Sequence, residues 1–137
     1  MTDKPTHIFN KQEKLKSRKL TKQLFAEGKS FLVFPIKVVY IPITESSDFP
    51  IKIGVSASSR TFKHAVDRNR IKRVLKEQYR LNKAPLHDFI ISHQQQIAVF
   101  FIYINKTLPE KDLIEKKMPI IIKKLITVLN ETIATTA

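Results

Sequence analysis

The chain of 137 residues contains no cysteine, no tryptophan and only two glycines. Without cysteine it can form neither a disulfide nor a thiolate metal site, which fits a reducing compartment, and we expect the cytoplasm. Two isolated glycines cannot build a glycine-rich phosphate-binding loop. The N-terminus lacks an apolar signal segment, and the apolar runs reach only about eight residues, too short to span a bilayer. We therefore expect no membrane association.

Acidic residues are also scarce. Twelve Asp and Glu against 25 Lys and Arg give a formal net charge of +13. This charge exceeds what solubility requires of a small domain and favours a polyanionic partner, with nucleic acid ahead of a membrane surface. The alternative is a generally basic, solvated surface. With 42% hydrophobic residues, residues 1–137 can bury one modest core and are expected to form a single nucleic-acid-binding domain, whose residues 1–17 are an extended or loosely docked basic arm.

The first helix is expected over residues 18–27. Apolar residues recur there at helical spacing. Ser17 is a suitable N-cap before it, and Gly28 would end the helix because glycine accepts the left-handed conformation.

Two strands are expected next. Residues 30–43 are rich in β-branched and aromatic side chains and predict one strand, with Pro35 and Pro42 marking its ends or an edge bend. Residues 51–58 alternate between apolar and polar or small side chains, as a strand with one buried face does. Gly54 within this strand indicates a bulge or a close approach by another backbone.

The second half of the chain predicts a further strand and a long helix. Residues 97–104 form the most β-prone run and lack alternation, which is typical of a central strand covered on both faces. Residues 84–95 could be a short helix or an irregular return. A helix is expected from 108 to about 132, with Pro109 in its first turn and a kink or break just before Pro119. The order predicts an α+β fold, a small single-layer sheet of about four strands packed by helices.

Between the strands lies the most charged stretch of the sequence, a predicted helix over residues 65–82. Its apolar stripe is narrow, and the rest of its circumference is almost entirely basic. A helix anchored by one stripe and charged elsewhere is suited to contact a polyanion. The stripe is expected to hold Ile71, Val74, Leu75, Gln78 and Leu81. From residue 60 to residue 80, Arg60, Lys63, Arg68, Arg70, Lys72, Arg73, Lys76 and Arg80 stand against Asp67 and Glu77.

Catalytic chemistry is not indicated by the sequence. The histidines at 7, 64, 87 and 93 are scattered and have no clustered carboxylates or metal-ligand spacing beside them. His64 could touch phosphate, but a surface or capping role is favoured, and His87 with Asp88 reads as a solvated loop. We therefore expect no metal bound by the protein alone.

RNA binding is better supported, because single-stranded RNA is held by grooves that combine positive charge with stacking surfaces. Phe25 with Lys29, Lys37 and Lys52 could supply such a groove, although Phe25 could equally be core between helix and sheet. Arg68, Asn69, Arg70 and Arg73 supply planar forks and an amide suited to phosphates and base edges. The alternative for the basic helix is a solvated face.

The stretch VDRNRIKRVLKEQYR closely resembles the signature helix of the protein subunit of bacterial ribonuclease P, in which an Arg-Asn-Arg core is followed by Lys-Arg. Upstream, IKIGVSASSR resembles the family's strand leading into basic residues, and LFAEG resembles the end of its first helix. Phe9 followed by Leu15 is similar to the family's N-terminal arm. The resemblance covers residues 8–82 well and residues 96–130 by pattern only.

The resemblance implies an RNA-dependent endoribonuclease. The RNA subunit would hold the catalytic Mg²⁺ and remove the 5′ leader of precursor tRNA, and the protein alone would be inactive, with no obligate protein partner. It also implies a left-handed strand-helix-strand crossover through the basic helix, against the usual right-handed rule. The residues implied to contact the catalytic RNA are Arg60, Lys63, Arg68, Asn69, Arg70, Lys72, Arg73, Lys76 and Arg80, and those implied for the leader are Phe25, Lys29, Lys37 and Lys52.

Two positions depart from the family pattern. Ser59 stands where a second basic residue is usual before Arg60, and Thr21 stands where an aromatic is common on the first helix. Phe25 is therefore the only aromatic residue of that helix. The alternative function is a noncatalytic ribosomal or RNA-chaperone-like protein, which the charge and the small fold would serve equally well.

Overall fold

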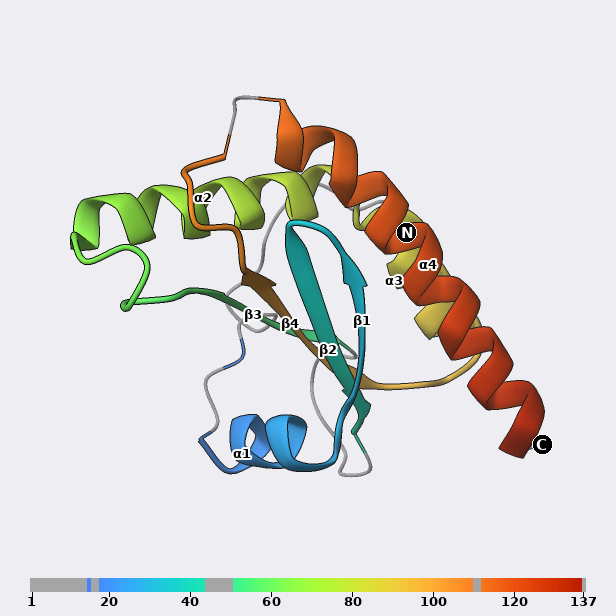
Figure 1. Ribbon diagram of the computed structural model, residues 1–137. Coiled ribbons are helices and arrows are strands. Elements are labelled where there is room, and N and C mark those ends of the chain that lie inside the picture. The colour runs from blue at the N-terminus through green and yellow to red at the C-terminus, as the bar shows by residue number, and fades with distance from the viewer. Residues whose placement is uncertain (1–14, 16–17, 44–50, 110–111, 137) are drawn as a thin grey trace.

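The computed structural model describes residue 15 and residues 18–43, 51–109 and 112–136. This part of the chain forms an α+β fold in which helices pack on one mixed sheet of four strands, in the order β1-β2-β4-β3 (Figure 1). The elements are α1 (Arg18–Glu27), β1 (Lys29–Val33), β2 (Ile36–Pro42), β3 (Ile51–Ala57), α2 (Ala65–Asn82), α3 (Ala84–Ser92), β4 (Ile97–Tyr103) and α4 (Leu113–Thr136).

The apolar run at residues 30–43 forms a hairpin, so the prediction of one strand was wrong. β1 and β2 pair antiparallel, with Val33 opposite Ile36. Pro35 lies in the tight turn between them, after a cis Phe34–Pro35 peptide bond. A proline without an N–H group suits a turn, and the β-prone composition on both sides conceals the reversal. Pro42 ends β2, as expected.

Both glycines are required by close contacts. Neither has a positive φ, so the predicted left-handed conformation at Gly28 was wrong. The Gly28 N–H donates to the Leu24 carbonyl at 2.8 Å, and a Cβ at Gly28 would collide with the carbonyl oxygens of Leu24 and Tyr40. At Gly54 a Cβ would lie 2.5 and 2.7 Å from two ring carbons of Phe100. The close approach at Gly54 therefore comes from an aromatic side chain on β4 and not from a backbone.

The strand β4 lies inside the sheet, as predicted, but the predicted cover on both faces is incomplete, because Phe100 and Ile102 are only half-buried. β4 pairs antiparallel with β2 and parallel with β3, and α2 and α3 connect the two parallel strands. This arrangement confirms the strand-helix-strand crossover through the basic helix, while its left-handed sense stays an implication of the resemblance. The polar connection after α2 contains the helix α3, which Leu86 and Ile90 anchor in the core.

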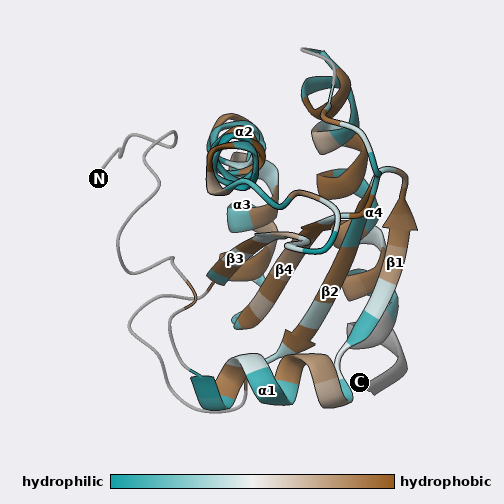
Figure 2. Ribbon diagram, turned by 60° about the vertical axis from the view of Figure 1, so that its left-hand side comes forward, coloured by the Kyte–Doolittle hydropathy of each residue, from teal (hydrophilic) through white to brown (hydrophobic). Residues whose placement is uncertain are grey.

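The two faces of the sheet are covered unequally. On one face, β-strand side chains pack with α2, α3 and α4 into the main core. On the other face, α1 covers only part of the sheet, where Leu24 packs with Val39, Ile41 and Ala98. Figures 1 and 2 show α1 apart from the other three helices. The rest of the second face is left open by the described elements.

The C-terminal helix starts later than predicted. It begins at Leu113, so Pro109 precedes it and does not lie in its first turn. Of the kink or break predicted just before Pro119, the break does not occur, because the helix continues through this residue. Pro119 is exposed, and buried Met118 and Ile121 on either side of it pack into the main core. Tertiary packing therefore compensates for the hydrogen bond that proline removes.

Candidate nucleic-acid interface

The helix α2 is anchored by a stripe with a four-residue repeat. Ile71, Leu75 and Tyr79 are fully buried, whereas Leu81, which the helical wheel placed in the stripe, is exposed. The buried stripe therefore includes Tyr79 in place of Leu81. The Tyr79 ring lies 5.9 Å from that of Phe101. A large aromatic with a polar end is buried here because its hydroxyl has a partner.

That partner is His87 on α3. The Tyr79 hydroxyl and His87 Nε2 lie 3.0 Å apart, and the two rings are 6.3 Å apart. His87 is half-buried within a helix, so its interpretation as a solvated loop residue was wrong. It joins α2 to α3 and is a structural group.

Opposite the stripe, α2 carries cations that face away from the protein. The exposed cations are Arg70, Arg73 and Lys76, and Lys72 is half-buried. The neutral side chain of Asn69 is exposed beside them. Within the described part of the chain, neither Arg70 nor Arg73 forms a hydrogen bond or an ion pair. Both guanidinium groups are thus available to bind phosphate in the bidentate geometry that arginine favours.

Arg80 is engaged differently. Its guanidinium forms an ion pair with Glu77 one turn earlier, with Arg80 Nη2 2.6 Å from Glu77 Oε2 and Nε 3.2 Å from Oε1. The hydrogen bond from Arg80 lowers the pKa of the Glu77 carboxyl, and the same bond raises the pKa of Arg80. Because the pair is exposed to water, it stabilises the fold little, but it neutralises part of the charge at the end of α2.

Arg68 is also engaged within the protein, which the sequence did not indicate. It lies three residues before Ile71, on the side of α2 that faces inward, and is half-buried. Its Nη1 donates to the carbonyl oxygens of Phe62 at 2.7 Å and Lys63 at 3.0 Å. The loop that precedes α2 is thereby tied to the helix. Arg60 and Lys63, both predicted to contact RNA, are exposed on this loop.

A second surface lies beside α1. Residues on the uncovered part of the sheet form a row across all four strands, in which Lys37 lies between Leu32 and Ile102, and Ser56 follows Ile102. The neighbouring row contains Phe100, whose ring is 5.2 Å from that of Phe25 on α1. We call the surface made by Leu32, Lys37, Phe100, Ile102 and Ser56 the open face.

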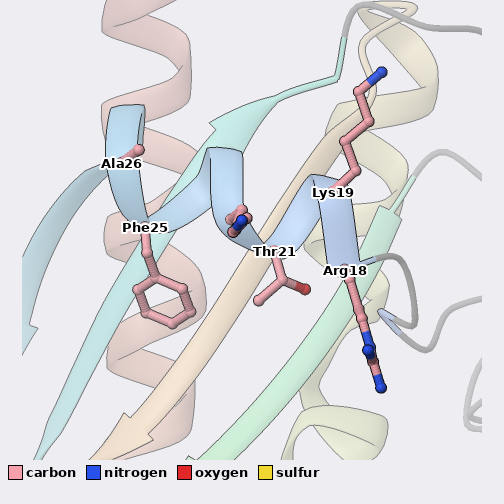
Figure 3. Close-up of a pocket in the computed structure, with 6 residues that line it drawn as sticks. Arg18, Lys19, Thr21, Phe25 and Ala26 are labelled. Carbon is pink, nitrogen blue, oxygen red and sulfur yellow. The ribbon is translucent and has the colours of Figure 1, made fainter.

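A pocket along α1 borders this surface. Figure 3 shows Arg18, Thr21 and Phe25 projecting in one direction over the strands, while Lys19 points the other way. Phe25 is 52% exposed, so it is not simply core between helix and sheet. The pocket combines an aromatic ring with cations. Its lining residues are Arg18, Lys19, Thr21, Lys22, Phe25 and Ala26.

Three of the four residues predicted for the leader, Phe25, Lys37 and Lys52, lie on the same side of the sheet. Lys37 is exposed on the open face, and Lys52 lies opposite Ala98 on the same side of the sheet. Lys29 pairs with Tyr40, whose side chain belongs to the main core, so Lys29 lies on the opposite side. The prediction missed Phe100, because the unbroken apolar run of β4 gives no alternation from which to assign faces.

The remaining titratable groups show no catalytic arrangement. His64 occupies the N-cap position of α2 without a side-chain capping bond, and the His93 ring stacks on Phe89 with centroids 4.2 Å apart. In residues 15, 18–43, 51–109 and 112–136, no group of three or more His, Cys, Asp or Glu could hold a metal ion. Over the same ranges, none of the helices has the length and apolar character that crossing a membrane demands.

A cationic helix on one side of an α+β sheet, with an aromatic and basic pocket along α1 on the other side, is typical of a small RNA-binding protein. The family model described as Ribonuclease P matches residues 9–125. The chain therefore belongs to the ribonuclease P protein family.

Similar proteins agree with this assignment. The chain is 36% identical over 118 residues to the ribonuclease P protein component of Porphyromonas gingivalis W83, covering 86% of each chain. It is 29% identical over 120 residues to that of Chlorobium phaeobacteroides, covering 80% of this chain and 82% of the relative. These relatives do not favour the alternative of a ribosomal or chaperone-like protein.

Solved structures show the same fold. The RNase P protein of Staphylococcus aureus superposes with a TM-score of 0.57 at 20% identity, covering 87% of this chain and 96% of that one. The RNase P protein from Thermotoga maritima gives a TM-score of 0.51 at 25% identity, with the same coverage.

Proposed function

We propose that the chain is the protein component of a ribonuclease P ribonucleoprotein in the cytoplasm. In this proposal it binds the catalytic RNA and precursor tRNA and assists endonucleolytic removal of the 5′ leader. The catalytic Mg²⁺ ions are held mainly by the RNA, and the protein by itself does not cleave. Family membership supports the assembly, and the exposed cations of α2 support the RNA contact.

One observation carries the proposal for α2: Arg70 and Arg73 are exposed beside Asn69 in the stretch that resembles the family signature. An arginine fork binds two phosphate oxygens at once, and a helix anchored by a buried stripe holds such forks in fixed positions. The surface therefore suits the backbone of a structured RNA. Lys72 and Lys76 add charge beside it.

The open face and the pocket along α1 suit a single strand. Phe25 and Phe100 offer ring surface on which a base can stack, and Lys37 and Arg18 offer charge to the backbone. We propose that the 5′ leader lies here, with Lys52 at the same side of the sheet. Lys29 is outside this surface by register, so we expect it to contribute least among the predicted leader residues.

The salt dependence of RNA binding tests the proposed contact of α2. Affinity for an in vitro transcribed bacterial ribonuclease P RNA is measured from low to high salt for Arg70→Ala and Arg73→Ala. Each lost phosphate contact should reduce the slope of log affinity against log salt by about 0.7–0.9. Lys123→Ala on α4 removes the same charge from an exposed position elsewhere and is the matched control. Slopes that fall equally in all three variants would show a nonspecific charge effect and contradict the proposal.

A further inference from the structure

The loop between β3 and α2 is ordered by hydrogen bonds within it. The Ser58 hydroxyl accepts hydrogen bonds from the backbone N–H groups of Arg60 and Thr61, at 3.2 and 3.4 Å. The Phe62 N–H donates to the Ser58 carbonyl at 2.9 Å. These bonds fold the residues after β3 into a turn.

Phe62 fixes one end of this turn in the core. Its side chain is only 6% exposed, and its ring lies 6.0 Å from that of Tyr103. The residues on either side of Phe62 are exposed, among them Lys63 and Arg60. The backbone between the buried ring and the start of α2 therefore determines where these two cations point.

Arg68 secures that backbone. Its Nη1 reaches the carbonyl oxygens of both Phe62 and Lys63, and no other side chain of the described residues is found to hydrogen-bond to either oxygen. A guanidinium suits this position because it carries several donors on a rigid plane, whereas the ammonium of lysine is compact and strongly hydrated.

We propose that Arg68 is a positioning residue, which orders the loop at residues 58–64 so that Arg60 and Lys63 meet the RNA, and that it is not itself a phosphate ligand. The proposal rests on the proposed function for its RNA partner. It separates Arg68 from Arg70, its neighbour in the signature stretch, which faces outward. Removal of Arg68 should therefore affect RNA binding only through the cations of the loop.

A double-mutant cycle tests this dependence. Affinity for the ribonuclease P RNA is measured for Arg68→Ala in the native protein and in the Arg60→Ala/Lys63→Ala background. We expect a loss of about tenfold in the native protein and less than about twofold in that background, because coupled residues are not additive. Arg70→Ala should cost the same factor in both backgrounds. An equal loss for Arg68→Ala in both would identify a direct contact and overturn the proposal.

Amide hydrogen exchange of the RNA-free protein gives an independent readout. Arg68→Ala should speed exchange at Phe62, which donates within the turn, and leave the amides near Leu75 in the centre of α2 unchanged. Unchanged exchange at Phe62 would overturn the proposal. If Arg68→Ala does not fold, Arg68→Lys keeps the charge and should still speed exchange at Phe62 in the RNA-free protein, whereas a residue that acts only by contacting phosphate would leave this exchange unchanged. Loss of the proposed function would instead appear as unaltered RNA affinity in Arg70→Ala and in Arg60→Ala/Lys63→Ala.

Discussion

Replacing Gly54 by alanine tests the packing of Phe100 on the open face. The new methyl group would lie 2.5 Å from the Phe100 ring, so the ring must shift, which disturbs its packing against Phe25. Overpacking costs about 1–3 kcal/mol, and loss of an aromatic pair costs about 0.5–1.5 kcal/mol. Alanine regains about 0.5–1 kcal/mol because it loses less backbone entropy than glycine in a strand. We expect Gly54→Ala to lower the free energy of unfolding by about 0.5–4 kcal/mol.

The sign of this effect depends on Phe100. In a Phe100→Ala background the collision is absent, so Gly54→Ala should become neutral or stabilise by about 0.5–1 kcal/mol. Urea unfolding monitored by circular dichroism measures all four proteins, and an unchanged slope with denaturant shows that only stability has changed. Equal destabilisation by Gly54→Ala in both backgrounds would refute the role of Phe100.

Three further substitutions separate the structural groups from the RNA-binding ones. Glu77→Gln releases Arg80 from its ion pair and should strengthen binding to the ribonuclease P RNA by about twofold to fivefold at low salt, with unfolding changed by less than about 0.5 kcal/mol; weaker binding would count against α2 as the contact. Tyr79→Phe deletes the bond to His87 and should lower the free energy of unfolding in urea by about 1 kcal/mol without altering RNA affinity. Leu24→Ala removes a fully buried anchor of α1 and should cost about 2–5 kcal/mol. If α1 borders the leader site, this variant should also lose the preference for long-leader over short-leader substrates in a cleavage assay, and an intact preference would place the leader elsewhere.

Local composition predicts several elements of this fold because their signals are short-range. Residues 97–104 have no polar alternation, which predicts a strand with neighbours on both edges and cover on both faces. The neighbours are there, but Phe100 and Ile102 are only half-buried on the open face. The basic helix likewise follows from charge and helical spacing. Between residues 30 and 43 the same rule fails, because both strands of the hairpin are apolar and only Pro35 marks the turn.

The orientation of individual cations is harder to predict. Every residue of the loop before α2 offers a backbone carbonyl, so nothing in the sequence distinguishes the two oxygens that bind Arg68. Lys29 and Lys37 both flank apolar strand residues, yet the register of the hairpin places them on opposite faces of the sheet. A shift of one residue in the register of a strand moves its side chains to the other face of the sheet. The register is known only once the pairing of the strands is known.

Reconstitution tests the central claim most directly. The purified chain, an in vitro transcribed bacterial ribonuclease P RNA and a precursor tRNA are combined at low Mg²⁺, and the cleavage site is mapped. We expect cleavage at the mature 5′ end only when protein and RNA are both present, and we expect Arg70→Ala/Arg73→Ala to require more protein for the same rate. Cleavage by the protein without RNA, or no stimulation of the RNA by the folded protein, would contradict the central claim.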